Sequence, residues 1–289
     1  MNGYRKNNRI KGAGTALVTP FAKDGSVDVP ALKALVRSNI AAGIDFLCVL
    51  GTTAETPTLS EAEKKIVRKA VLEENAGRVP LLLGYGGNNT AAIISAVRND
   101  DLSGFDALLI VAPYYNKPNQ EGLFRHFKAI SEASPLPILL YNIPGRTGVN
   151  INIDTICRIA DSCPNVVGVK EASGNIVQIK TLLSARPEGF VVISGDDSLT
   201  LEMMGMGADG VISVVSNARP AEMCAVVRGD AAANEALSPL YKLLFAEGSP
   251  TGIKALLAIE GKMENILRLP LVEASEKLIS ELREFAKLK

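Results

Sequence analysis

Short apolar runs alternate with longer amphipathic stretches over the first three quarters of the chain. Most of the short runs are apolar at nearly every position, which is typical of parallel strands buried on both faces. The stretches between them carry apolar residues at helical spacing. We therefore predict eight strands, at Gly14–Thr19, Phe46–Leu50, Leu81–Tyr85, Ala107–Ala112, Ile138–Asn142, Val166–Lys170, Val191–Gly195 and Gly210–Val215.

Polar N-caps mark where the helices between these strands begin. Asp28 starts a helix that Gly43 ends. Ser60 and Glu63 have the spacing of a capping box, in which each side chain accepts a hydrogen bond from the other residue's backbone N–H. Further helix starts are predicted at Asn89, Asn119–Glu121, Asn152, Asn175, Asp196–Ser198 and Asn217.

Eight strand–helix units in about 215 residues predict an α/β fold of the closed (β/α)8 TIM-barrel type. The alternative is an open doubly wound sheet, which normally carries a Gly-rich dinucleotide turn after an early strand. Residues 84–87 come nearest to such a turn and have the wrong spacing. The closed barrel is therefore favoured.

The strand pattern stops at about Arg219, and only helical patterns follow. These exceed what closing a barrel needs. We predict a barrel over residues 1–218 and, over residues 219–289, the last barrel helix plus a helical appendage. The predicted helices lie near Ala221–Arg228, Ala231–Ala246, Pro250–Ile259 and Glu273–Leu288.

Charge and composition exclude several classes of function. Lys plus Arg and Asp plus Glu both number 31, so the chain lacks the positive field that nucleic acid or an anionic membrane requires. The one histidine, His126, excludes sites that need two or three imidazoles from one chain, including most metal-dependent aldolases. We therefore predict no metal, no cofactor, no nucleic acid and no membrane partner.

Cysteine usage and the N-terminal segment indicate a cytoplasmic protein. The four cysteines show no CxxC motif and are interpreted as buried thiols in a reducing compartment. The first residues are basic and polar without an apolar core, unlike a secretory signal, and no run is long enough for a membrane helix. We expect Arg5, Lys6, Arg9 and Lys11 to form a solvated arm.

In a TIM barrel the reactive groups lie at the carboxyl ends of the strands and in the loops that follow. Lys170 ends the sixth predicted strand and shares a face with Gly168. If that face is the barrel interior, desolvation disfavours the ammonium form and leaves an amine that can attack a carbonyl. The alternative is a lysine that extends from the strand end into solvent.

The other strand ends offer hydroxyls, phenols and a guanidinium. Thr52 and Thr53 follow the second strand, where backbone N–H groups and hydroxyls suit a carboxylate, although hydroxyls can also simply hold a turn. Tyr115, beside Tyr114, follows the fourth strand and could carry a proton or anchor a subunit contact. Tyr141 ends the fifth strand, and Arg146 on the next loop could bind a substrate carboxylate or form an ordinary ion pair.

Two further candidates are weaker. Asp196 and Asp197 could ligate Mg²⁺, but an Asp at a loop–helix junction is more often an N-cap, and we prefer that interpretation. His126 lies within a helical pattern away from the strand ends, so a Ser-His-Asp hydrolase is poorly supported. Without a metal set, carbanion chemistry needs an iminium as its electron sink, which favours a class I aldolase mechanism.

At these positions the chain also resembles the dihydrodipicolinate synthase / N-acetylneuraminate lyase family, over nearly its whole length. Within the family, Arg146 and the Thr52–Thr53 pair are similar to the synthases rather than the sialic acid lyases, while Gly145 departs from the Ser of many synthases. The matching motifs are residues 51–55, 113–118, 141–144, 168–172, 194–197 and 210–213.

The resemblance implies a role for each matching residue. Lys170 forms a Schiff base with pyruvate and Tyr141 moves the proton as imine becomes enamine. Thr52 links Tyr141 in a proton relay to Tyr115, which a neighbouring subunit supplies. The remaining residues bind substrate. Thr53 and Ile212 hold the pyruvate carboxylate and the product, Arg146 binds the carboxylate of aspartate semialdehyde, and Gly195 joins the substrate-binding residues.

The resemblance further implies a homotetramer and lysine biosynthesis, with two alternatives left open. The Schiff base could serve a sialic acid or keto-deoxy-sugar aldolase, or the barrel could have lost catalysis and only bind. Feedback inhibition by lysine is predicted to be weak or absent, although Asn88 and Tyr114 match lysine-sensitive relatives. Ala92 replaces the glutamate that would bind the amino group of lysine, and Glu61 and Lys64 replace histidines found in some relatives.

Overall fold

The computed structural model describes residues 3–6 and 8–287. Its strands follow one another in chain order around a closed barrel and pair in parallel, each with the next in sequence, so the predicted (β/α)8 TIM barrel is confirmed. The strands are β1 (Gly12–Ala16), β2 (Phe46–Val49), β3 (Leu81–Tyr85), β4 (Ala107–Val111), β5 (Ile138–Asn142), β6 (Val166–Glu171), β7 (Val191–Ser194) and β8 (Gly210–Ser213).

The predicted strands are all present, and β3 and β5 have the predicted bounds. β6 continues one residue further, because Glu171 still pairs with Asn142 of β5. Asn217 does not open a helix as predicted. Its buried side-chain amide accepts a hydrogen bond from the backbone N–H of Val18 at 3.2 Å and donates one to the carbonyl of Ala16 at 2.8 Å. Asn217 therefore binds the backbone at the end of β1 instead.

The predicted helices are also present, and most predicted N-caps are confirmed. Asp28 accepts a hydrogen bond from the N–H of Ala31, and Ser60 and Glu63 form the predicted capping box. The last predicted helix residue, Leu288, lies outside the described residues. The long helices are α2 (Val29–Ala41), α3 (Glu61–Asn75), α4 (Thr90–Asn99), α5 (Gln120–Ala133), α7 (Ile153–Ser162), α8 (Ile176–Ala185), α10 (Pro220–Val227), α11 (Ala231–Leu243), α12 (Thr251–Ile259) and α13 (Glu276–Lys287).

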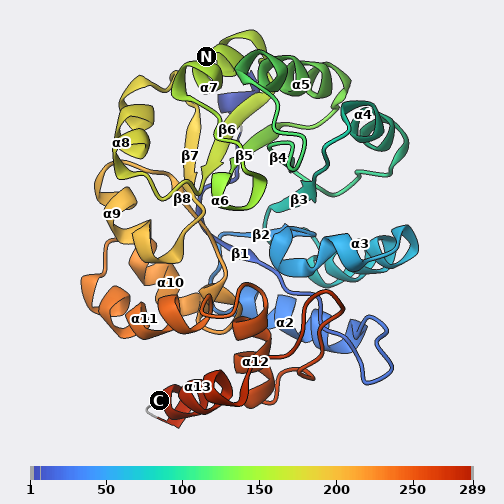
Figure 1. Cartoon of the computed structure of the whole chain (residues 1–289), viewed down its shortest axis with the longest axis vertical. Coiled ribbons are helices and arrows are strands. Elements are labelled where there is room, and N and C mark those ends of the chain that lie inside the picture. Colours follow the sequence, from blue (N-terminus) through green and yellow to red (C-terminus); the bar gives the residue numbers. More distant parts are fainter. Residues whose placement is uncertain (1–2, 7, 288–289) are drawn as a thin grey trace. The chain divides into compact units, whose positions relative to one another are not determined.

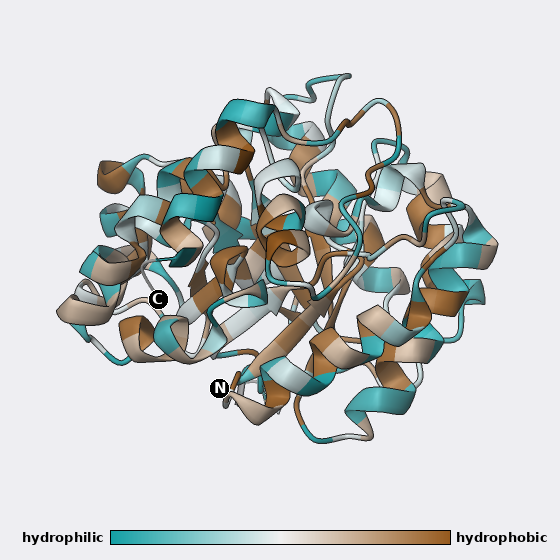
Figure 2. Cartoon of the chain, turned by 90° about the horizontal axis from the view of Figure 1, so that it is seen from below, coloured by the Kyte–Doolittle hydropathy of each residue, from teal (hydrophilic) through white to brown (hydrophobic). Residues whose placement is uncertain are grey.

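The chain divides into two compact units, residues 1–12 with 80–212 and residues 13–79 with 213–289. In the first, α4, α5, α7 and α8 pack in succession outside the strands of the same unit (Figure 1). In the second, α2 packs on α3, α10 on α11, and α12 on α13. The strands are mostly apolar, whereas the helices carry apolar and polar faces (Figure 2). The division at residue 218 stays a prediction.

The predicted solvated arm is confirmed for Arg9 and Lys11, which are exposed, and is wrong for Arg5, which packs against Phe190. The side chain of Lys6 lies outside the described residues. Residues 3–6 form one helical turn, α1 (Gly3–Lys6), and the guanidinium of Arg5 lies 5.6 Å from the centroid of the Phe190 ring. The carboxylates of Asp106 and Asp209, directly before β4 and β8, accept the backbone N–H groups of Leu81 in β3 and Val192 in β7. The same carboxylates form ion pairs with two further cations of the arm. The ion pairs are Arg9–Asp106 and Lys11–Asp209.

The cysteines agree with their interpretation as reduced thiols. In the described part of the chain all four are free, three of them are buried, and Cys157 is partly exposed. Burial raises the pKa of the Cys224 thiol to about 11, which disfavours the reactive thiolate. Within residues 3–6 and 8–287, no helix is long and apolar enough to cross a membrane.

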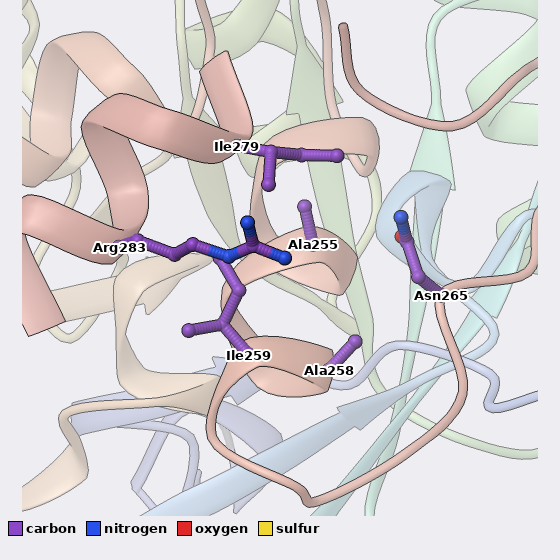
Figure 3. Close-up of a pocket in the computed structure, with 6 residues that line it drawn as sticks. All are labelled: Ala255, Ala258, Ile259, Asn265, Ile279 and Arg283. Carbon is purple, nitrogen blue, oxygen red and sulfur yellow. The ribbon is translucent and has the colours of Figure 1, made fainter. Parts of the chain in front are cut away.

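A pocket of about 320 Å³ lies between α12 and α13 in the second unit (Figure 3). The side chain of Arg283 extends into it, and Asn265 approaches from the loop after α12. None of the candidate residues at the strand ends lines it, so this pocket is separate from the predicted chemistry. Its lining residues are Ala255, Ala258, Ile259, Asn265, Ile279 and Arg283.

The stability of the protein should fall below pH 6.5 because of His126 on α5. Its imidazole is buried, its Nδ1 lies 2.8 Å from the hydroxyl of Thr90, and burial lowers its pKa to about 4. Between pH 6.5 and 4 the unfolded chain therefore binds a proton that the folded chain does not. Stability is full above pH 6.5, and by linkage about 3 kcal/mol is lost as the pH falls through this window.

Unfolding by urea at several pH values checks this prediction. The His126→Gln variant removes the titrating group and should lack this part of the pH dependence, while the carboxylates contribute equally to both proteins. Parallel pH curves for the two proteins would contradict it.

Candidate active site

Lys170 and Tyr141 face each other across the β5–β6 pair. They are register partners, and the Nζ of Lys170 lies 4.3 Å from the centroid of the Tyr141 ring. The lysine is only 7% exposed, so the alternative of a side chain extending into solvent is wrong. In the described chain no carboxylate forms an ion pair with it. The strand end thus presents a sheltered amine beside a phenol.

Gly195, directly after β7, provides the space that the lysine side chain occupies. A Cβ at this position would lie 2.9 Å from Cε and 3.2 Å from Cγ of Lys170, and 2.6 Å from the Cβ of Ala172. These distances are shorter than van der Waals contact. Only glycine therefore fits beside the extended lysine, which supports placing Gly195 in the site.

On the opposite face of the same strands, Asn142 and Glu171 form a buried polar network that the sequence reasoning missed. Glu171 accepts from the amide of Asn142 at 3.0 Å and from the N–H of Ser173 at 2.7 Å. Asn142 also donates to Asn150 at 2.8 Å. Because each residue directly follows Tyr141 or Lys170, these bonds fix the two strand ends. In the sequence, the available signal for this network was a polar residue directly after each of the two candidate reactive residues.

The Thr52–Thr53 turn belongs to the second unit. It forms a single 3-10 turn (Thr52–Ala54), in which Thr52 is exposed and Thr53 is buried. The first residues of such a turn have no acceptor within it for their N–H groups, so both N–H groups and the Thr52 hydroxyl are available for an anion. The residue after the turn, Glu55, is fully buried and bonded to Lys254.

Tyr115 lies on the loop after β4, whereas Arg146 lies in the one-turn helix α6 (Pro144–Thr147) after β5 rather than on a loop as predicted, and both are exposed. Tyr115 is 89% exposed and has φ = 74°, a left-handed conformation that is uncommon for a residue with a large side chain. The two loops meet where Lys117 packs over Gly148. Ile212 is buried in β8. The structure thus groups Lys170, Tyr141 and Gly195, and leaves Tyr115 and Arg146 open to solvent.

The aspartates after β7 are not arranged as a metal site. The carboxylate of Asp196 accepts from the N–H of Ser198 at 2.9 Å and caps a short 3-10 helix (Asp197–Leu199), as the preferred interpretation predicted. Among the residues that the structure describes, no three His, Cys, Asp or Glu side chains are grouped to hold a metal ion.

Comparisons with known proteins agree with this geometry. Residues 9–289 match the model of the dihydrodipicolinate synthetase family. The 4-hydroxy-tetrahydrodipicolinate synthase of Phocaeicola vulgatus is 49% identical over 272 residues, which are 91% of this chain and 92% of that protein.

Solved structures give the same result. Dihydrodipicolinate synthase from Thermotoga maritima is 43% identical with a TM-score of 0.93, covering 97% of this chain and 99% of that one. The enzyme from Acinetobacter baumannii, solved with pyruvate, is 40% identical with a TM-score of 0.92, covering 96% and 98%. The chain therefore belongs to the dihydrodipicolinate synthetase family.

Proposed function

We propose that this protein is a 4-hydroxy-tetrahydrodipicolinate synthase, which condenses pyruvate with L-aspartate 4-semialdehyde in lysine biosynthesis. The observation that carries the proposal is the buried amine of Lys170 against the ring of Tyr141. The names of the curated relatives at 44–49% identity support the same reaction. No metal or cofactor is required, because the iminium itself serves as the electron sink.

The amine of Lys170 attacks the carbonyl of pyruvate, and loss of water gives the iminium. Removal of a methyl proton then gives the enamine, whose carbon attacks the aldehyde of the second substrate. The product amine cyclises onto the iminium carbon and releases Lys170 by transimination. Tyr141 moves the protons in these steps, a role taken from the pattern of the family, and the contact of its ring with the amine supports the assignment. Shelter from water favours the condensation.

We assign the other roles from the pattern of the family. Thr52 passes a proton between Tyr141 and Tyr115, because a lone phenol with a pKa of about 10 is a poor shuttle at neutral pH. The substrate-binding residues are Thr53, Ile212 and Gly195 for pyruvate and Arg146 for the semialdehyde.

We further propose that the enzyme is a homotetramer in the cytoplasm. The 89% exposure and left-handed backbone of Tyr115 support a contact that a second subunit completes. Light scattering of the purified protein measures the assembly. Weak inhibition by lysine stays a prediction, which an assay with millimolar lysine decides.

Replacing Arg146 with alanine should lower kcat/KM for the semialdehyde by about 100-fold, because a guanidinium–carboxylate pair is lost. Pyruvate should still form its iminium at a near-normal rate, since Arg146 serves the second substrate. A coupled assay with both substrates, together with borohydride trapping of pyruvate alone, separates the two effects.

An assay for cleavage of a sialic acid, run beside the coupled assay, tests the alternative of a sugar aldolase. Arg125 on α5 is exposed and pairs with Glu121, so Arg125→Ala is a matched control that should leave both steps unchanged. If wild-type protein cleaved a sialic acid and did not consume the semialdehyde, the proposed function would be wrong.

A further inference from the structure

Two residues with left-handed backbone flank the turn that carries Thr52 and Thr53. Leu50 and Glu55 both have φ = 55°, a region that residues with side chains rarely adopt. Such a conformation persists only where surrounding contacts hold it in place. The turn therefore needs an anchor outside its own backbone.

Glu55 is anchored by two residues of the C-terminal region. One carboxylate oxygen lies 2.5 Å from the Nζ of Lys254 on α12, and both side chains have no exposed surface. The other oxygen accepts the backbone N–H of Arg268 at 3.0 Å. Both oxygens of a residue two positions after Thr53 are thus held by residues about two hundred positions away.

Arg268 holds the far side of the same loop. Its guanidinium donates to the carbonyl of Thr58 at 3.0 Å and forms an ion pair with Glu63, the capping-box residue of α3. Both cations contact the ring of Phe21, whose centroid lies 4.1 Å from Lys254 Nζ and 4.3 Å from the guanidinium carbon of Arg268. Residues 254–268 therefore bind the segment that follows the Thr52–Thr53 turn at three places, Glu55, Thr58 and Glu63.

General stabilisation does not explain a buried ion pair at this place. Burial removes both charges from water and lowers the pKa of Lys254, so the pair must offset a large desolvation cost. Apolar residues of similar size would stabilise the fold at least as well. Apolar residues could not form the directional bonds to the two carboxylate oxygens that hold Glu55 in its left-handed conformation.

We propose that the Glu55–Lys254 ion pair makes the C-terminal helices a positioning device, which holds the Thr52–Thr53 turn in the geometry that binds pyruvate. This inference rests on the proposed function, in which Thr53 holds the pyruvate carboxylate and Thr52 relays a proton. Glu55 and Lys254 are then positioning residues, and the appendage has a role in the reaction.

Three variants test this: Glu55→Gln, Lys254→Met, and the two combined. Each single variant leaves one buried charged group without its ion-pair partner and should lower the melting temperature. The double variant leaves no buried charge without its partner, and only a neutral amide N–H group of the introduced glutamine lacks an acceptor, so it should recover part of that loss. All three should raise KM for pyruvate by 10-fold or more and slow borohydride-trapped iminium formation at Lys170. Recovery of stability without recovery of KM is the result that a merely structural role would not give.

Glu260→Gln is the matched control. Glu260, at the end of α12, forms an ion pair with Arg219, with 2.6 Å between Oε1 and Nη2, and this pair does not involve the Thr52–Thr53 turn. It should lower the melting temperature and leave KM within 2-fold of wild type. If Glu55→Gln does not fold, the double variant carries the test. A folded double variant with KM within 2-fold of wild type would overturn the inference.

A readout without catalysis separates this inference from the proposed function. Wild-type protein that fails to condense the two substrates refutes the function. Hydrogen exchange of the peptide spanning residues 51–58 then decides the inference. Faster exchange in the double variant than in Glu260→Gln supports the anchor, and equal exchange overturns it.

Discussion

Replacing Lys170 with methionine should abolish condensation, lowering kcat by about 10⁴-fold or more. Methionine keeps a similar length and removes only the nucleophile. The side chain is buried, and an apolar replacement avoids the cost of burying an amine, so the variant should fold and melt at or above the wild-type temperature. A coupled assay measures the rate. Mass spectrometry after treatment with pyruvate and borohydride measures the adduct.

The adduct pattern provides the control. Lys180 on α8 is exposed, so Lys180→Met should keep full activity and one adduct per chain at Lys170. The Lys170→Met protein should carry none. A stoichiometric pyruvate adduct on Lys170→Met would place the Schiff base on another amine and refute the mechanism.

The strand pattern predicted the fold, and the strand-end rule singled out the residues that form the candidate site. Parallel strands buried on both faces are recognisable because few positions in them tolerate polarity. A lysine such as Lys170 at the end of such a run is therefore conspicuous. The resemblance to the family implied that Tyr141 acts on the imine of Lys170, whereas the residue pattern alone could not place the two side by side, because the register of β5 and β6 is not contained in a single sequence.

Asn142 and Glu171 could be singled out as polar residues next to candidate reactive ones, but the partners in the supporting contacts could not be predicted, because those contacts join residues that are remote in sequence. Glu171 binds Asn142 across two strands, and Glu55 binds Lys254 across about two hundred residues. The docking of Arg5 was missed for the same reason, since the ring of Phe190 lies far along the chain. Local patterns identify reactive groups, whereas the residues that orient them depend on tertiary structure.

Replacing Gly195 with alanine should lower kcat/KM by about 100-fold while the protein still folds. The added methyl would lie 2.9 Å from Cε of Lys170 and 2.6 Å from the Cβ of Ala172, so at least one of them must move. Overpacking of this kind costs about 1–3 kcal/mol of stability. The lysine is the more flexible neighbour. It therefore shifts first, and a misplacement of about 1 Å can cost a hundredfold in rate.

Gly205→Ala is the matched control, because this glycine is helical, on α9 (Thr200–Gly205), and a Cβ there would meet nothing within 4 Å. Alanine should be neutral or slightly stabilising at that position. The displaced amine of Gly195→Ala should also form the trapped pyruvate adduct more slowly, which locates the defect at the first step. Normal adduct formation combined with slow turnover would mean that the methyl obstructs the second substrate instead, and that Lys170 does not depend on the space beside Gly195.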